Sequence, residues 1–461
     1  MTEAQLALIA VAAAGIGVLV LLVTRLKFNA FAALLVAALL VGIGSGKPAL
    51  VIVKAFQEGL GATLGGTAAV IALGAVLGRL LGESRGAEVL AERLTQTFGP
   101  QRIVWCLMTL ALVVGLATWF TVGLLLILPI LQTLARESKR PSGQLALPIL
   151  ACLSVMHGLM PPHPGPIVAI DALHARTGMV LLWGFVLGLP VCLLCGPVLA
   201  RFVGRELDSP DGGAAVSPPV TAGTSAPQPA RQQLPERLTR RPGFGLTLVS
   251  ILLPVFLMLL ATVAGLLPDT GSSWRASAEF IGHPTVALLI AVLFSMWSLG
   301  TRCGFGRGEL LKFSEESIAA VAMAILVVGG GGGFARVLRD AGVADAVGSL
   351  AGSLHVPPLV YGWLVAAFIR VATGSATVAI TAGSALLAPV LAANPGTNVE
   401  LAVIALAFGS LFLSHLNDGG FWVVKECLGL SVRQTLRTWS VMETLVGVAG
   451  LGLTLLASVL I

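Results

Sequence analysis

The stretch Ser154-Val-Met-His-Gly-Leu-Met-Pro-Pro-His-Pro-Gly-Pro166 interrupts a long apolar segment. Its four prolines between Pro161 and Pro166 remove four backbone donors and block a continuous helix. Non-helical backbone at membrane depth survives only where protein or a wet cavity surrounds it. The stretch therefore predicts a broken helix, whose free carbonyls and following helix N-terminus can hold a cation and an anion respectively. An extracellular loop that turns the chain is the alternative interpretation.

The composition around this stretch is that of a polytopic membrane protein. Hydrophobic residues make up 56% of the 461 residues and charged residues only 11%, against roughly 25% charged in soluble domains. So little charge excludes a soluble enzyme, a disordered protein and a disulfide-stapled secreted domain. The net charge of +6 is assigned to cytoplasmic loops rather than to nucleic acid binding, so the lipid bilayer is the expected partner.

Fourteen apolar runs divide the chain into two halves. We expect a first transmembrane repeat over 1–203, a flexible linker over 204–243 and a second transmembrane repeat over 244–461, because the linker is too polar and proline-rich to bury a core. Lys and Arg concentrate in alternate loops, which places the linker in the cytoplasm and both termini outside. The runs lie near 5–23, 28–45, 60–82, 103–119, 119–135, 143–160, 178–203, 244–268, 280–300, 317–334, 357–372, 374–392, 398–414 and 434–461.

The two halves resemble each other. The segment 79–86 matches 336–342 with one residue inserted. The spacing from His157 to Trp183 is also nearly the same as that from His415 to Trp439. An odd number of crossings in each half makes the repeat inverted. Inverted repeats are how many secondary transporters build a central site that can face either side.

A second polar cluster, Ser414-His-Leu-Asn-Asp-Gly-Gly-Phe-Trp422, ends an apolar run in the second half. Its Asn-Asp-Gly-Gly sequence predicts another unwound helix and places the ionisable residues His415 and Asp418 close together. A helix cap at the cytoplasmic face would explain the same residues, since Asp and Gly supply caps routinely.

A third cluster, Arg370-Val-Ala-Thr-Gly-Ser-Ala-Thr377, is rich in small hydroxylated residues. Ser375 and Thr377 can donate to a hydroxyl-rich or carboxylate ligand at the tip of a hairpin. Close helix packing through small residues is the alternative. Its counterpart in the first half is Thr118-Trp-Phe-Thr-Val-Gly123.

Signatures of catalysis and ATP binding are missing from the sequence. The glycine run 329–333 lacks the Gly-Lys-Ser/Thr ending of a phosphate loop, and no nucleophile elbow occurs. His157 and His163 without a nearby acid make a poor zinc site. We therefore expect no catalytic residue, no metal and no cofactor, and the chain is not expected to be an enzyme.

Taken in this order, the clusters resemble the gluconate permease family of bacterial inner-membrane symporters, within the ion transporter superfamily. The resemblance covers nearly the whole chain except the linker. It rests on the stretches 154–166, Gly374–Val378 and Ser414–Trp422 with Val424-Lys-Glu426, and it is supported by Gly59–Gly65 and Thr438–Thr444.

The resemblance implies a multi-pass inner-membrane protein that takes up gluconate or a related sugar acid with a proton. It also implies an elevator mechanism, in which 119–136 and 374–396 form re-entrant hairpins that do not all cross the membrane. One departure is Thr121, where the family is expected to carry an acid, so coupling here would rest on His157, His163, His415 or Asp418.

The predicted fold is therefore an all-α polytopic membrane protein, built as two inverted repeats with re-entrant hairpins and broken helices. His415 is the predicted proton carrier, with Asp418 as its counterion, because an imidazole titrates near neutral pH. The predicted substrate-binding residues are Thr121, Ser154, His157, Pro162, His163, Gly165, Gly374, Ser375, Thr377 and Asn417.

Other functions stay open at this point. A sodium-coupled carrier of another small carboxylate or of D-serine is the nearest alternative, since unwound carbonyls suit Na⁺ as well. A channel or an intramembrane enzyme is the alternative from another class. A homodimer is compatible with the sequence, which does not fix the oligomeric state.

Overall fold

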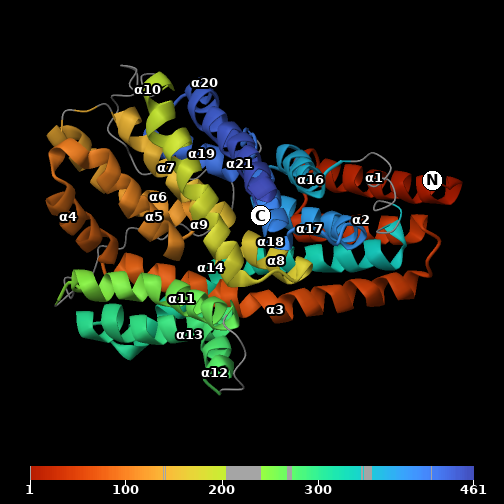
Figure 1. Cartoon of the computed structure of the whole chain (residues 1–461), viewed down its shortest axis with the longest axis horizontal. Coiled ribbons are helices and arrows are strands. Elements are labelled where there is room, and N and C mark those ends of the chain that lie inside the picture. Colours follow the sequence, from red (N-terminus) through yellow and green to blue (C-terminus); the bar gives the residue numbers. More distant parts are fainter. Residues whose placement is uncertain are drawn as a thin grey trace.

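The computed structural model describes residues 2–138, 140, 142–203, 240–266, 273–343, 346, 356–416 and 418–460. Within these ranges the ordered elements are all helices, and no strand occurs. The all-helical prediction is confirmed for this part of the chain (Figure 1). The predicted linker lies outside the described residues from 204 to 239.

The helices follow each other with short connections. Those of the first half are α1 (Glu3–Thr24), α2 (Ala30–Gly44), α3 (Ala49–Glu83), α4 (Gly86–Phe98), α5 (Ile103–Ala117), α6 (Phe120–Ser138), α7 (Ser142–Leu159), α8 (Pro164–Leu173), α9 (Thr177–Leu193) and α10 (Leu199–Val203), with the short helices η1 (Pro100–Arg102) and η2 (Leu194–Val198).

The second half has the same character. Its helices are α11 (Phe244–Leu266), α12 (Ser273–Gly282), α13 (Pro284–Ser295), α14 (Arg307–Asp340), α16 (Pro358–Thr373), α17 (Ala376–Ala393), α18 (Val399–Leu411), α19 (Gly419–Leu428), α20 (Val432–Thr435) and α21 (Val441–Leu460), with the short helices η5 (Met296–Gly300), η6 (Thr301–Cys303) and η7 (Leu436–Ser440).

Nine helical segments in the described ranges are long and apolar enough to cross a membrane, and five more are apolar but shorter. Each of the fourteen predicted apolar runs overlaps one of them. Many large apolar side chains on these helices are exposed, including Leu50, Phe202 and Val459. Such exposure would be unfavourable in water, and it is what lipid contact requires.

Four interruptions separate pairs of consecutive helices, two in each half. In the first half α5 gives way to α6 at Thr118 and Trp119, and α7 ends at Leu159 before α8 begins at Pro164. The second half has the same order: α16 and α17 are separated by Gly374 and Ser375, and α18 and α19 by residues 412–418. The break predicted from the prolines is present, and α8 begins with Pro164 because proline fits the first helical position.

Two long helices, α3 and α14, pack along each other, and α3 follows much of the long axis of the molecule (Figure 1). With 35 residues, α3 is about 52 Å long, well beyond the roughly 30 Å of a hydrocarbon core. Glycines allow the close approach. A Cβ on Gly59 would overlap the Gly332 carbonyl, and one on Gly333 would lie 2.6 Å from the Phe56 ring. The glycine run 329–333 thus serves helix packing, with no phosphate loop.

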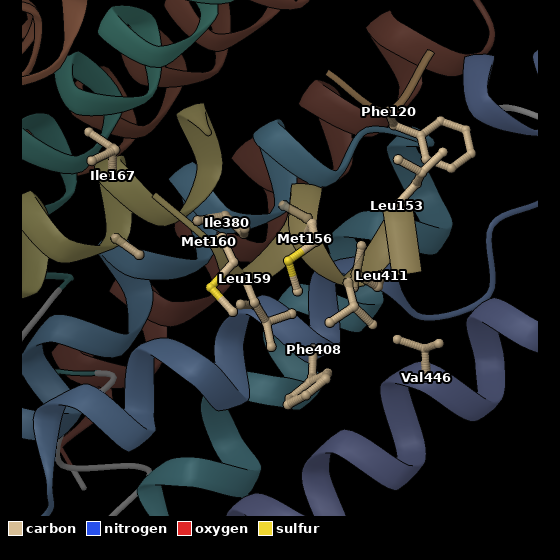
Figure 2. Packing of buried hydrophobic residues seen from close by; sticks show 14 of the residues in the cluster. Phe120, Leu153, Met156, Leu159, Met160, Ile167, Ile380, Phe408, Leu411 and Val446 are labelled. Carbon is tan, nitrogen blue, oxygen red and sulfur yellow. The ribbon is translucent and has the colours of Figure 1, made fainter. Parts of the chain in front are cut away.

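The core joins the two halves around the broken helices. Figure 2 shows Met156 and Leu159 of α7 among Phe408 and Leu411 of α18, with Val446 of α21 nearby. Helices α7 and α18 come close because Gly158 has no side chain: a Cβ there would lie 2.7 Å from a Leu411 methyl group. This packing places the breaks of both halves in one region.

Candidate functional site

The break between α7 and α8 is held by its two histidines. His163 is buried, and its Nε2 lies 2.8 Å from the carbonyl oxygen of Gly115, near the end of α5. The His157 ring lies 4.8 Å from the His163 ring and 5.9 Å from the Trp119 ring, measured between centroids. His157 Nδ1 is buried without a hydrogen-bonding partner. Because buried polar atoms are normally paired, this nitrogen is free for a ligand.

The break between α18 and α19 is held by a buried ion pair. Arg370, near the end of α16, donates from Nη2 to Asp418 Oδ2, and both residues are less than a tenth exposed. Asp418 also caps α19, since its Oδ1 accepts from the Gly420 N–H at 2.8 Å. A carboxylate at a helix N-terminus is favoured by the helix dipole. The carboxylate is thus fully engaged.

Ser414 and Trp439 hold the same break against the last helices. The Ser414 hydroxyl donates to Asp418 Oδ2 and accepts from Trp439 Nε1 at 2.7 Å. The Ser440 hydroxyl donates to the Ser414 carbonyl. His415 Nε2 lies 3.0 Å from the Val371 carbonyl oxygen, and no ion pair joins His415 to Asp418 in the described structure. In both halves, therefore, a histidine at the break contacts a carbonyl two helices earlier, in α5 for His163 and in α16 for His415.

The tip between α16 and α17 carries the predicted hydroxyl groups. Gly374 has φ +73°, a left-handed conformation that glycine adopts without strain, and it ends α16. Ser375 then caps α17, its Oγ accepting from the Val378 N–H at 3.3 Å. Ser375 and Thr377 are half-buried. Their hydroxyl groups thus lie at the positive end of a helix, where anions are favoured.

The structure brings most of the predicted residues into one region. The first turn of α8 meets α17, since a Cβ on Gly165 would lie 2.6 Å from Ile380 Cδ1. Pro162 lies next to Gly74 of α3. Ser154 is buried in α7, whereas Thr121 is exposed in the first turn of α6. Asn417 lies outside the described residues.

Two buried charged residues were missed by the sequence-based site prediction. Arg370 interacts electrostatically with His157 of the other half as well as with Asp418. Glu443, in α21, is 1% exposed, and neither of its carboxyl oxygens has a hydrogen-bonding partner. The signal was available, because Glu443 is the only acid in the last apolar run and ionisable residues in spanning segments are functional candidates by default.

The Glu443 carboxyl group completes the cluster. It interacts electrostatically with Arg370 and Asp418, and it lies beside the Ser154 hydroxyl outside hydrogen-bonding geometry. We call Ser154, His157, Arg370, Asp418 and Glu443 the buried polar cluster. It draws residues from α7 in the first half and from α16, α19 and α21 in the second. Such an arrangement can bind an anion at Arg370 and exchange a proton at a carboxyl group.

Comparisons with known proteins agree with a transport function. The sequence profile described as GntP family permease matches residues 6–460. A gluconate permease of Pseudomonas aeruginosa is 41% identical over 443 residues, covering 96% of each chain. A high-affinity gluconate transporter of Escherichia coli is 35% identical over 96% of this chain and 97% of its own. A Gnt-II system L-idonate transporter of Escherichia coli is 35% identical over 95% of this chain and 96% of its own.

Among solved structures, the YdaH transporter of Alcanivorax borkumensis, reported to have an unusual topology, is similar at a TM-score of 0.56. The match covers 87% of this chain and 86% of that one at 16% sequence identity, so it supports the fold alone. The sequence matches are nearly full-length and they are to permeases, in agreement with the expectation of a non-enzyme. With its apolar helices, its two broken helices and this sequence similarity, the chain belongs to the GntP permease family.

Proposed function

We propose that this multi-pass permease takes up gluconate, or a closely related sugar acid, together with a proton. The names of its relatives, gluconate permease and L-idonate transporter, support a sugar-acid substrate. The observation that carries the proposal is Arg370, a buried positive charge where broken helices of both halves meet. A buried cation with an unpaired Nε is suited to a small carboxylate.

The substrate would lie between the helix starts. Ser375 and Thr377 donate to its hydroxyl groups or carboxylate from one side. The wall on the other side is the first broken helix, with Ser154, His157, Pro162, His163 and Gly165. The N-terminal ends of α8 and α17 point positive dipoles at an anion held there. Thr121, Gly374 and Asn417 are further predicted members of this site.

Alternating access by an elevator motion of inverted repeats is part of the proposal. The order of elements supports it, since α5–α6, α7–α8 and α9 in the first half are followed in the second by α16–α17, α18–α19 and α20–α21. The long helices α3 and α14 would belong to the scaffold, and the broken helices to the part that moves. Both ends of such a site can then open in turn.

Proton coupling distinguishes this proposal from its nearest alternative, a sodium-coupled carrier of another small carboxylate or of D-serine. His415 and Asp418 are the pair that the sequence suggests for the proton. The buried polar cluster supplies titratable groups at the proposed binding site, which supports proton coupling. An inner-membrane location follows from the same proposal, because the proton gradient across that membrane drives uptake.

Uptake of labelled gluconate into proteoliposomes tests the function. An imposed gradient, acidic outside, should drive accumulation that a protonophore abolishes. Replacing sodium with choline should leave accumulation unchanged. Accumulation that resists the protonophore and needs sodium would refute proton coupling, and failure to compete with labelled gluconate would exclude D-serine. A channel would equilibrate gluconate without ever concentrating it.

A further inference from the structure

We propose that Glu443 is the group that carries the proton, and that its charge controls how strongly Arg370 attracts the substrate anion. This inference rests on the proposed function and names the coupling residue of that same site. It moves the proton from the predicted pair His415 and Asp418 to a residue of the last helix.

The surroundings of Glu443 are what a reversible proton site requires. The carboxyl group is 1% exposed, and both oxygens are buried without a hydrogen-bonding partner. An ionised carboxylate in such a place is costly, whereas a neutral acid is tolerated. The cation that interacts with it, Arg370, already donates to Asp418. Glu443 is therefore the carboxyl group of the cluster whose charge is least compensated.

The groups facing Glu443 come from several helices. Among the described residues, the cation that interacts with Glu443 is Arg370 of α16, while Asp418 at the start of α19 is an acid and Ser154 of α7 is neutral. Cys195 of η2 also interacts with it. Two further charged groups lie on elements that pack against α21 without interacting with Glu443: the buried Glu400 of α18 is paired with Arg176 at 2.7 Å, and Arg437 of η7 is exposed. Protonation of Glu443 thus changes the balance around one cation, Arg370.

The other titratable groups are less suited to this role. Asp418 is held by Arg370, Ser414 and the Gly420 N–H, so protonation would break three contacts. His163 and His415 each contact a backbone carbonyl. His157 interacts with Arg370, and a proton there would add a second positive charge beside the first.

Coupling then follows from charge balance. On the outer side, a proton from water forms an O–H bond on a Glu443 carboxylate oxygen, and the neutral acid no longer competes for Arg370. The gluconate carboxylate binds to the cation in its place. On the inner side, the substrate leaves and the O–H bond gives its proton back to water. Because binding of proton and anion favour each other, neither is carried efficiently alone.

Gluconate binding to purified protein across a pH series tests the assignment. In the wild type, affinity should be constant at low pH and fall by about tenfold per pH unit once Glu443 loses its proton. Glu443→Gln, which mimics the neutral acid, should bind gluconate at every pH with the affinity that the wild type has at low pH. It should also exchange labelled for unlabelled gluconate across a membrane while losing accumulation driven by a pH gradient.

Glu400→Gln is the matched control, since it also removes a buried carboxylate but lies outside the cluster. It should retain the pH dependence of the wild type. Proton uptake by wild-type protein on addition of gluconate, followed with a pH indicator in weak buffer, gives a measurement that needs no variant. We expect about half a proton for each gluconate bound at the midpoint of the Glu443 titration, rising to about one proton at higher pH.

The outcomes separate the two proposals. If Glu443→Gln keeps the pH-dependent affinity of the wild type, Glu443 is not the carrier, and proton-coupled gluconate uptake still stands. If Glu443→Gln does not fold and the wild type takes up no proton with gluconate, the Glu443 assignment and proton coupling both fail, and only gluconate binding by the permease still stands. If the wild type binds no gluconate at any pH, the proposed function itself fails, and this inference fails with it.

Discussion

Arg370 near the end of α16 and Asp418 at the start of α19 form a buried ion pair that joins the two interruptions of the second half. The pair fixes the broken helix α18–α19 against the tip that carries Ser375. It also sets where a positive charge sits in the buried polar cluster. We therefore expect stability and substrate binding to depend on the same two side chains.

Removing one partner of this pair should be costly. Arg370→Ala leaves Asp418 buried and unpaired, which typically destabilises a protein by about 3–5 kcal/mol. We expect a large drop in the unfolding temperature in detergent, together with loss of gluconate binding. The double variant Arg370→Ala, Asp418→Ala should recover part of the stability but none of the binding.

The exposed pair Lys54–Glu58, at 4.0 Å, provides the control. Lys54→Ala should cost less than about 1 kcal/mol, as surface ion pairs do. Equal losses for Lys54→Ala and Arg370→Ala would show that burial of the second pair contributes nothing. Gluconate binding by a stable Arg370→Ala protein would remove Arg370 from the substrate site.

Ser375 is expected to donate to the substrate. Ser375→Ala should abolish transport in the proteoliposome assay while the protein is still made and inserted. Its loss as a helix cap costs only about 1 kcal/mol, which does not explain a complete loss of activity. Ser431→Ala removes an equivalent cap at α20, outside the cluster, and should transport normally.

Asn417→Ala is predicted to lose transport as well, on the same assay. Wild-type uptake by either Ser375→Ala or Asn417→Ala would remove that residue from the site. Since Asn417 lies outside the described residues, its expected role rests on the sequence pattern Asn-Asp-Gly-Gly alone.

The helices were predictable because their signals are local. Apolar runs set the spans, and the prolines of 161–166 fixed the break before α8. The contacts within the cluster were less accessible, because they join residues far apart in sequence. Nothing near Asp418 indicates that Arg370, 48 residues earlier, is its partner instead of His415. As the single acid of the last apolar run, Glu443 was a candidate from the sequence, but its burial without a hydrogen-bonding partner could be seen only in the structure.

Packing of α3 on α14 should be sensitive to single methyl groups. Gly59→Ala forces a Cβ onto the Gly332 backbone, which cannot move aside as a flexible side chain could. Overpacking of this kind costs about 1–3 kcal/mol. Gly61→Ala, two residues on in the same helix, meets nothing within 4 Å and should be neutral or slightly stabilising, because alanine favours helices over glycine. Unfolding in detergent measures both, and equal stability of the two variants would contradict the close contact.

Uptake is expected to be electroneutral. A single proton carrier paired with a singly charged gluconate moves no net charge, so the membrane potential adds nothing to the driving force. A potential imposed with valinomycin and a potassium gradient should leave accumulation unchanged, whereas a pH gradient should support about tenfold accumulation per unit. Sodium coupling with one ion would also be electroneutral but would ignore the pH gradient, so the two measurements together identify the coupling ion. Accumulation driven by the potential alone would mean that a second cation moves with each anion. A single carboxyl group such as Glu443 could not then account for all of the coupling.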